Sequence, residues 1–574
     1  MPVGAAPVKP AARRWLLPAA GPGAGAPPLL SRVLAARGLP AAAVGPFLAG
    51  GPVAHDPFAL RDMAAAVEVI GASVGRGERL AVYGDYDADG VTACALLVRT
   101  LRAAGAEVRP YIPSREAEGY GLNAEALAEL AAAGVATVVT VDCGTTAVAV
   151  AAGRPAGLRL VITDHHLPAH GPGGEVALAP AEALVNPRRP DDDYPFKGLA
   201  GVGVAYKLAS ALEQAGVVPA GTAEAQLCLV ALGTVADMMP LVDENRALVR
   251  AGLARWRRDP PPGLRALAGL AGCPAGPTSS DLAFAIAPRI NAAGRMEDAG
   301  TALACCLADD AAAGERAATE LQALNGRRRA SLQSAMAVAR AAVEALDDRT
   351  AAVALGDPTF AAGVVGLVAG RLVEAFGRPA FVHSETGDEW RGSARGVPGL
   401  NVVDLLEACA PTLRRFGGHA AAGGYSLDPD PAAAAAFRAR LLEVVAAARP
   451  AGPPERTFTV DAVCTLGDCT LERADELAAL EPVGTGNPPA LLAALDCRVE
   501  GTTAFGAAGD HLRVDLQDAT GRAQAVTFNR PHLRPHLPLG RRIDCLFGLE
   551  ADEWRGRRRV RLLLRDVRPH RPAA

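Results

Sequence analysis

The chain has 574 residues, of which 50% are hydrophobic, and its formal net charge is −4 at pH 7. This length exceeds what one hydrophobic core can organise, so we expect about three globular domains. No run approaches the roughly 18 apolar residues of a membrane-spanning helix, and the small net charge gives no argument for a nucleic-acid partner. The 11 cysteines form no CxxC pairs, and Pro and Gly interrupt the N-terminal apolar residues, which predicts a cytoplasmic protein with reduced thiols.

The first part of the chain has the pattern of a parallel α/β sheet. After an N-terminal extension over residues 1–49, expected to be partly flexible, short Val/Ile/Leu runs alternate with Ala/Leu-rich helical stretches over residues 50–299. The runs "RLAVYG", "VATVVTV" and "LRLVIT" read as strands, and "GVTACALLVRTLRAAG" reads as the helix after the first of them.

Three further segments follow in chain order. Residues 300–347 are predicted to form a connecting helical segment, and a second α/β unit covers residues 348–447. The Pro-rich stretch "ARPAGPPER" is the clearest linker. After it, residues 457–574 read as short strands and turns, typical of a small all-β domain such as an oligonucleotide-binding barrel.

Acidic residues and imidazoles gather where the predicted strands end. Asp85 and Asp87 follow the first strand, Asp142 the second, and the sequence Asp164-His165-His166 the third. Ligands of open α/β sheets bind outside the carboxyl ends of the strands, so these groups can converge on one crevice, which Asp237 could close.

Carboxylate oxygens with one or two imidazoles suit Mn²⁺ or Mg²⁺ better than a thiolate-preferring metal. The number of carboxylates makes two ions plausible, about 3.5–4 Å apart, an arrangement that activates water and stabilises the departing oxygen in phosphoester hydrolysis. For the alternating acids Asp85, Asp87 and Asp89 alone, or for Asp164-His165-His166 alone, the alternative is a solvated turn or a helix cap.

Several ordered motifs carry a family resemblance. They are "VYGDYDADGVTA", "YIPSREAEGYGLN", "VDCGTT", "TDHH", "VNPRRPDDDYPFKGLAGVGVAYKL", "ALGTVADMMPL", "APRINAAGRM", "FGGHAAAGG" and "LEPVGTGNPPA". The chain resembles the DHH phosphoesterases and, among them, the bacterial RecJ single-stranded-DNA exonucleases. The resemblance implies a DHH catalytic domain and a DHHA1 substrate-binding domain around a cleft, a long connecting helix and an OB-fold barrel. It also implies 5′-to-3′ cleavage of single-stranded DNA to 5′-mononucleotides, in recombinational and mismatch repair.

The resemblance assigns metal-site roles residue by residue. Asp85 and Asp87 would each bind one of two Mn²⁺ or Mg²⁺ ions, and Asp142 would bridge them. His165 and Asp237 would complete the coordination of the second ion. His166 would face the scissile phosphate, while Asp89 and Asp164 either bind metal or orient a ligand.

Substrate phosphate also needs hydrogen-bond donors, which arginine supplies in pairs. The candidates that the family motifs contain are Arg115, Arg289, Arg295, Ser393 and Arg395, with surface ion pairs as the alternative. Gly417 and Gly418 would let the backbone approach the substrate, with His419 as a polar contact, unless they form only a tight turn.

Two positions depart from the family pattern. Gly423 replaces the second Ala of the usual GGHxxAAG motif, a change expected to matter little. Gly396 stands where the family commonly has Ser, which could remove one hydroxyl contact to the substrate.

In the last domain, "DEWRGRRRVRLLLRDVRPHRP" concentrates arginines as a strand that follows a phosphate backbone would, with Trp554 and Phe528 as stacking candidates; the alternative is a solvated strand face. Because every expected metal ligand precedes the linker, a chain ending near Arg449 is expected to retain hydrolytic chemistry. The resemblance also makes a single-strand-binding protein and a helicase candidate partners. The alternative functions are a DHH oligoribonuclease or dinucleotide phosphodiesterase, or a nonhydrolytic DNA-binding scaffold of the same fold.

Overall fold

The computed structural model describes residues 13–18, 27–50, 55–115, 118–119, 121–170, 175–347, 350–448, 456–506, 509–554 and 556–571. The extension predicted for residues 1–49 therefore falls partly outside the described residues. The chain divides into two compact units, one comprising Trp15–Ile290, Ala299–Ala318 and Phe458–Ala574, the other Met1–Arg14, Asn291–Asp298 and Thr319–Thr457. We describe each unit by itself. None of the described helices combines the length and apolar character needed to cross a membrane.

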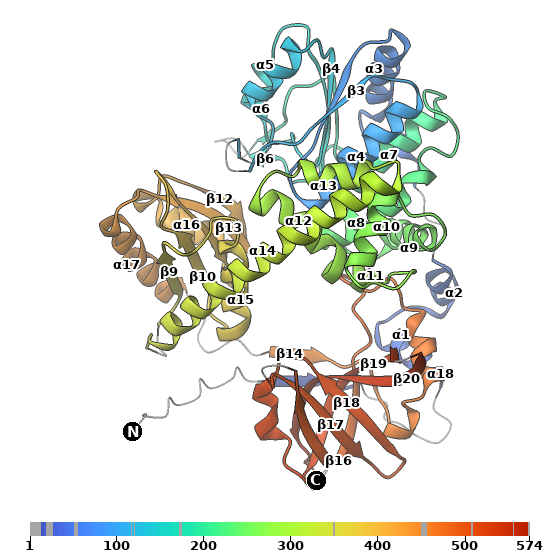
Figure 1. Ribbon diagram of the computed structural model, residues 1–574, viewed down its shortest axis with the longest axis vertical. Helices are drawn as coiled ribbons and strands as arrows, with labels where there is room; N and C mark the ends of the chain where they lie inside the picture. Colours follow the sequence, from blue (N-terminus) through green and yellow to red (C-terminus); the bar gives the residue numbers. More distant parts are fainter. Residues whose placement is uncertain are drawn as a thin grey trace. The chain divides into compact units, whose positions relative to one another are not determined.

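A five-stranded parallel sheet organises the first domain of the larger unit, with the strand order β3-β2-β4-β5-β8 (Figure 1). Its strands are β2 (Leu80–Tyr83), β3 (Val108–Tyr111), β4 (Thr137–Val141), β5 (Arg159–Thr163) and β8 (Ala183–Val185). All residues of β2 and β4 are buried, as expected for strands covered on both faces. Because β2, β4 and β5 are neighbours, their carboxyl ends lie side by side.

Helices cover this sheet and extend the domain (Figure 1). They are α3 (Met63–Gly75), α4 (Ala88–Ala103), α5 (Ala124–Ala132), α6 (Val148–Ala152), α7 (Gly201–Gln214), α8 (Leu227–Ala236), α9 (Asp243–Arg258), α10 (Pro262–Leu270), α11 (Ser279–Asp281), α13 (Gly300–Leu307) and the first residues of α12 (Ala287–Met296), which belongs to the smaller unit from Asn291 onward. A small hairpin is formed by β6 (Ala169–His170) and β7 (Val176–Ala177). The predicted parallel α/β domain is confirmed.

The smaller unit contains a mixed sheet with the order β12-β13-β11-β10-β9, in which β9 and β10 are parallel and the other pairs are antiparallel. Its elements are β9 (Val353–Asp357), α15 (Val365–Phe376), β10 (Ala380–Ser384), β11 (Trp390–Arg395), α16 (Val402–Ala408), β12 (Arg415–His419), β13 (Ala422–Leu427) and α17 (Pro431–Ala448). The long connecting helix is α14 (Ala311–Glu344). Within this unit Leu332, Met336 and Val343 of α14 join the core beneath the sheet.

A closed barrel forms the C-terminal part of the larger unit, because β16 pairs with both β17 and β19. Its strands are β15 (Ala462–Val463), β16 (Leu492–Phe505), β17 (His511–Gln517), β18 (Arg522–Thr527), β19 (Arg542–Trp554) and β20 (Arg557–Pro569). Around it lie β1 (Arg13–Leu16), α1 (Leu29–Ala36), α2 (Ala41–Ala49), β14 (Arg456–Thr459) and α18 (Leu471–Ala478). Leu29 and Val33 of α1 belong to the same apolar core as the barrel strands.

The predicted barrel is confirmed, but two details differ from the sequence reading. Strands β16, β19 and β20 have 14, 13 and 13 residues, so they are not short. Helix α18 was not predicted; its capping residue Thr470 accepts a hydrogen bond from the backbone N–H of Arg473. All 11 cysteines are free thiols, as expected.

Candidate active site

The register of the parallel sheet brings the strand-end acids together. Tyr83 of β2 pairs with Thr140 of β4, and Thr140 pairs with Ile162 of β5, so the residues that follow each strand emerge at one level. Asp237 is positioned by a helix rather than by a strand, because it caps the carboxyl end of α8. Four segments distant in the sequence therefore meet at one place.

The side chains form three overlapping groups, each with possible ligand atoms within 4.8 Å of one another. The groups are Asp85 with Asp87 and Asp142, Asp142 with His165 and His166, and Asp89 with His165 and Asp237. His165 Nε2 lies 3.0 Å from Asp142 Oδ1 and 3.6 Å from Asp237 Oδ2. Asp142 belongs to two groups, the position expected for a bridging ligand.

These groups fit a divalent cation. Asp85 Oδ1 and Asp142 Oδ1 are buried and have no hydrogen-bond partner among the described residues, although His165 Nε2 is 3.0 Å from the latter. An unsatisfied buried acceptor costs about 1–3 kcal/mol, and more when it is charged. Neighbouring ligands in an octahedron with metal distances of about 2.1 Å lie about 3 Å apart, which matches the observed separation.

The acids raise one another's pKa values in the absence of a cation. Burial, and then the charge of Asp87, raises the pKa of Asp85 to about 8. Burial and the surrounding carboxylates raise the pKa of Asp142 well above its usual range. The pKa of Asp237 rises to about 7, mainly through burial and the charge of Asp87. A bound cation would compensate this repulsion.

Asp87 and Asp89 also organise the backbone around the groups. Asp87 Oδ1 caps α4 by accepting from the N–H groups of Asp89 and Gly90, at 2.9 and 3.1 Å. Both oxygens of Asp89 accept from the start of α7, at 2.7 Å from Gly201 N and 2.9 Å from Val202 N. A Cβ at Gly201 would lie 2.5 Å from the Cβ of Asp142, so α7 can approach Asp142 only with glycine there.

The two histidines differ in charge. Asp164 Oδ1 lies 2.8 Å from His166 Nδ1, and although burial raises the pKa of Asp164, this bond and the imidazole charge hold it below its usual range. Burial lowers the pKa of His166, but Asp164 outweighs it and the pKa rises to about 9. Burial and the charge of His166 lower the pKa of His165 to about 4, which keeps His165 neutral, the form that binds metal.

Three neighbouring residues were missed by the sequence analysis. Thr145 N donates to Asp164 Oδ2 at 2.9 Å, and Asn186 Nδ2 donates to Thr145 Oγ1 at 2.9 Å and to His166 O at 2.8 Å. Arg188 is exposed, donates to His165 O at 3.5 Å, and its charge lowers the pKa of Asp237. Asn186 and Arg188 lie in the motif "VNPRR", which the sequence analysis quoted without assigning a role to its residues.

Of the predicted phosphate contacts in the larger unit, Arg115 lies near the acids: its guanidinium is 5.3 Å from the centre of the Tyr86 ring, and its charge lowers the pKa of Asp85. Arg289 donates to Ala285 O within its own helical segment, at 2.5 Å.

In the smaller unit, three predicted contacts surround the start of α15. Arg395 donates to Ser393 Oγ at 2.9 Å, and a Cβ at Gly366 would lie 3.0 Å from that hydroxyl and 3.2 Å from Arg395 Nη2. Arg295 Nη1 donates to Gly363 O, two residues before α15, at 3.4 Å. A guanidinium and a hydroxyl beside the start of a helix form a favourable setting for an anion.

The glycine-rich strand β12 exposes Gly417, Gly418 and His419. A Cβ at Gly418, where φ is 145°, would lie 2.4 Å from Ala422 O, so this glycine is required by the β12–β13 pair itself. His419 Nδ1 accepts from Ala421 N at 3.3 Å.

The two departures from the family pattern meet at one side chain. A Cβ at Gly396 would lie 2.9 Å from Val402 Cγ2, and a Cβ at Gly423 would lie 3.1 Å from Val402 Cγ1 and 2.8 Å from Leu406 Cδ1. Tight packing against Val402 therefore explains why both positions are glycine.

The arginines of β20 are largely paired with acids. Arg559 pairs with Asp552 at 3.1 Å, Arg561 with Glu550 at 3.0 Å, and Arg558 with Asp475. The Trp554 side chain lies outside the described residues. That this strand contacts phosphate stays a prediction, with Arg558, Arg559 and Arg561 already paired with acids.

A different face of the barrel combines exposed aromatics with arginines. Phe505, His511 and Phe528 stand on adjacent strand ends with ring centres 5.2–6.0 Å apart, and the two phenylalanines are 37% and 42% exposed. Arg513 and Arg522, on the same strands, form no ion pair with another described residue.

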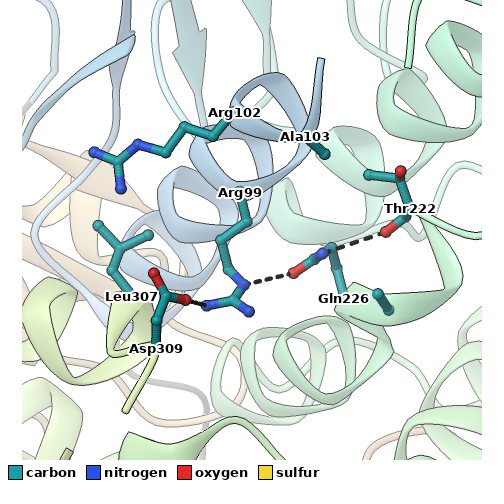
Figure 2. Close-up of a pocket in the computed structure, with 8 residues that line it drawn as sticks. Arg99, Arg102, Ala103, Thr222, Gln226, Leu307 and Asp309 are labelled. Atoms are coloured by element: carbon teal, nitrogen blue, oxygen red, sulfur yellow. Dashed lines mark hydrogen bonds and ion pairs between the residues drawn. The ribbon is translucent and has the colours of Figure 1, made fainter. Parts of the chain in front are cut away.

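A cavity of about 370 Å³ lies at the far end of α4 from the acidic groups (Figure 2). Figure 2 shows hydrogen bonds among some of its lining residues: Arg99 donates to Gln226 Oε1 at 3.2 Å and to Asp309 Oδ1 at 3.1 Å, and Gln226 donates to Thr222 O at 3.2 Å.

Three segments match known protein families. They are the DHH family N-terminal domain over residues 79–234, the DHHA1 domain over residues 347–447 and the RecJ OB domain over residues 460–566.

Comparisons over most of the chain identify relatives with a common description. The chain is 35% identical to the single-stranded-DNA-specific exonuclease RecJ of Bacillus subtilis over 531 residues, which cover 89% of this chain but only 64% of the relative. It is 36% identical to the protein of the same description from Dickeya dadantii over 532 residues, covering 88% of this chain and 90% of that protein. The crystal structure of RecJ in complex with Mn²⁺ from Thermus thermophilus matches with a TM-score of 0.79 and 31% identity, over 98% of this chain and 80% of that one. The corresponding Mg²⁺ complex matches with a TM-score of 0.73 and 30% identity, over 98% of this chain and 79% of that one.

Proposed function

Because this chain belongs to the RecJ family of DHH phosphoesterases, we propose that it is a metal-dependent exonuclease that degrades single-stranded DNA from the 5′ end to 5′-mononucleotides in repair and recombination. The observation that carries the proposal is the buried cluster of Asp and His side chains with unsatisfied carboxylate oxygens. The relatives' description as single-stranded-DNA-specific exonucleases supports the substrate class.

The grouping of side chains supports a division of ligands between two Mn²⁺ or Mg²⁺ ions. Asp85 and Asp87 would hold one ion, His165 and Asp237 the other, and Asp142 would contact both. When bound, such ions lower the pKa of an attacking water and offset negative charge on the leaving oxygen.

The remaining residues near the acidic groups would bind the substrate phosphate or orient the side chains that do. Asp89 would fix α7 against the ligands, because both of its oxygens accept from that helix. Asp164 holds His166 through Nδ1, and the raised pKa of His166 keeps a proton on the ring at neutral pH. His166 would therefore donate a hydrogen bond to an oxygen of the scissile phosphate, with Arg115 and Arg188 adding positive charge nearby.

For the 5′ end, the arrangement around the start of α15 supports a phosphate contact by Ser393, Arg395 and Arg295. Arg289, Gly417, Gly418 and His419 are proposed as further substrate contacts from the family motifs.

On the barrel, the Phe505–His511–Phe528 face is the better candidate for stacked bases, because base stacking needs exposed rings and the flanking Arg513 and Arg522 retain charge for phosphates. A cytoplasmic location stays a prediction from the N-terminal sequence and the cysteines, and partnership with a single-strand-binding protein and a helicase stays a prediction from the family resemblance.

The deciding experiment is digestion of 5′-labelled and 3′-labelled single-stranded DNA, and of blunt duplex, with Mn²⁺, Mg²⁺ or EDTA. We expect 5′-mononucleotides from single strands only, appearing first from the 5′ label and only with metal. Degradation from the 3′ end, or cleavage of dinucleotides but not longer strands, would contradict the proposal and favour the smaller-substrate alternative.

Recognition of the 5′ end can be tested separately. Replacing Arg395 with Ala should reduce the preference for a 5′-phosphate over a 5′-hydroxyl, while Arg415→Ala, which removes an exposed arginine paired with Glu389, should not. Equal rate losses on the two substrates would show that Arg395 does not contact the 5′-phosphate.

A further inference from the structure

The loop Asp237–Val242, between α8 and α9, holds the one proposed ligand that does not follow a strand. Within the larger unit this loop contacts a segment more than 240 residues away in the chain: Leu241 N donates to Thr485 O at 2.7 Å. Thr485 belongs to the segment Leu480–Asn487, which leads from α18 into the barrel and which we call the docking segment.

Two glycines let the docking segment lie against the loop. A Cβ at Gly484 would be 2.9 Å from Leu241 Cδ1. At Gly486, where φ is 75°, a Cβ would be 3.2 Å from Pro240 Cβ and 3.3 Å from Val242 Cγ1. A side chain at Gly486 would therefore be strained in its own backbone and would press on the loop.

The docking segment is internally fixed. Asn487 is 4% exposed, and its Nδ2 donates to Leu480 O and Pro482 O, both at 2.8 Å. Its backbone closes a tight turn with Gly484, through bonds of 2.8 and 3.2 Å in the two directions. The segment thus presents a preformed surface to the loop.

Two residues of the catalytic domain anchor it. Arg246 of α9, 3% exposed, donates to Leu480 O at 2.9 Å and to Glu481 O and Pro482 O, both at 3.2 Å. Ser279 Oγ donates to Val483 O at 2.7 Å. Without the segment, this guanidinium would lose three of its carbonyl acceptors and keep Phe47 O at 3.3 Å.

We propose that the docking segment positions Asp237 for metal binding, so that attachment of the barrel and metal affinity are coupled. The inference rests on the proposed function of the acidic groups as a metal centre. The other proposed ligands are set by strands of a buried sheet or by the residues that follow them, whereas Asp237 is 28% exposed at a helix end and depends on its loop. A chain ending near Arg449 would lack this support and should bind metal more weakly, which the sequence analysis did not anticipate.

The test compares two variants with matched backbone strain. Gly486→Val places a branched side chain against Pro240, whereas Gly540→Val introduces the same residue at φ 76° with no atom within 4 Å of its Cβ. Mn²⁺ affinity is measured without DNA from the electron paramagnetic resonance of the free ion, alongside the melting temperature and the affinity for single-stranded DNA in EDTA.

We expect Gly486→Val to raise the Mn²⁺ dissociation constant by about tenfold or more, the effect typical of groups that support a ligand. Gly540→Val should leave that constant unchanged, although both variants melt at lower temperature. Asn487→Ala, which loosens the turn without a clash, should also weaken Mn²⁺ binding. Equal Mn²⁺ affinity in wild type, Gly486→Val and Asn487→Ala would overturn the inference. Failure of the wild type itself to bind Mn²⁺ would overturn the proposed metal centre, and the inference with it.

Discussion

The acidic groups beside the parallel sheet and the arginine-rich strand β20 are both concentrations of like charge in the sequence, yet the structure treats them in opposite ways. Asp85 and Asp142 are buried, crowd one another, and carry oxygens without a hydrogen-bond partner among the described residues. Along β20, Arg561 pairs with Glu550, and Arg568 pairs with Asp544 at 2.9 Å.

This difference shows where the protein needs a ligand, such as a metal ion or a phosphate, to compensate a charge. Buried carboxylates have lost water, and the nearby charges of His166 and Arg115 do not prevent burial and mutual repulsion from raising the pKa of Asp85, so the remaining charge is compensated by protons or by metal. Exposed arginines with adjacent acids are already compensated, and they gain little from a phosphate that must displace those acids. Concentrated charge in a sequence indicates a ligand only where folding leaves that charge unpaired.

The largest expected effect comes from removing charge at the buried acids. We expect Asp142→Asn to lower the cleavage rate by more than about 100-fold, since a catalytic metal lowers the activation barrier by several kcal/mol. The same variant should melt at a higher temperature than wild type in EDTA, because Asn replaces a carboxyl group whose ionised form is disfavoured by burial and by the neighbouring carboxylates. Asp193→Asn, at an exposed acid of the same domain, is the control. Near-normal turnover by Asp142→Asn would exclude Asp142 as a bridging ligand.

A smaller effect concerns pH and metal together. Because the folded pKa of Asp85 is about 8, well above its ordinary value near 4, the unfolded chain ionises first, and the stabilising contribution, full below about pH 4, is lost as pH rises to about 8. His165, with a lowered pKa of about 4, acts in the opposite direction only below about pH 6.5.

Between pH 6.5 and 8, therefore, the melting temperature in EDTA should fall. Saturating Mn²⁺ should restore stability, by about 2.7 kcal/mol at a free concentration 100 times the dissociation constant. Thermal melting at both pH values, with EDTA or Mn²⁺, measures this. A melting temperature that rises with pH in EDTA would show that the buried acids are compensated by the protein itself.

The smallest effect distinguishes paired from unpaired arginines on the barrel. Arg513→Ala should reduce the slope of log affinity for single-stranded DNA against log salt by about 0.7, the contribution of one phosphate. Arg561→Ala should change the slope less, because Glu550 and Asp552 already pair with that side chain. Binding is measured in EDTA across a salt series. A larger change in this slope for Arg561→Ala than for Arg513→Ala would show that β20 contacts phosphate, as the sequence suggested.

Much of the fold and of the candidate site followed from local sequence patterns. Short apolar runs that end in Asp85, Asp142 and Asp164 predict buried parallel strands with acids at their carboxyl ends, because strand formation and burial depend on neighbouring residues. The barrel and the long helix were predictable for the same reason.

Tertiary structure alone decided the rest, since it depends on residues distant in the chain. Only folding shows that Asp89 accepts from the start of α7, that acids of other elements pair with Arg558 and Arg561 of β20, and that the rings of His511 and Phe505 meet at Phe528. Likewise, no local pattern connects Leu241 with Thr485. Hydrogen bonds and ion pairs between remote segments leave no periodic trace in the sequence, because each partner satisfies its own local pattern equally well with or without the other.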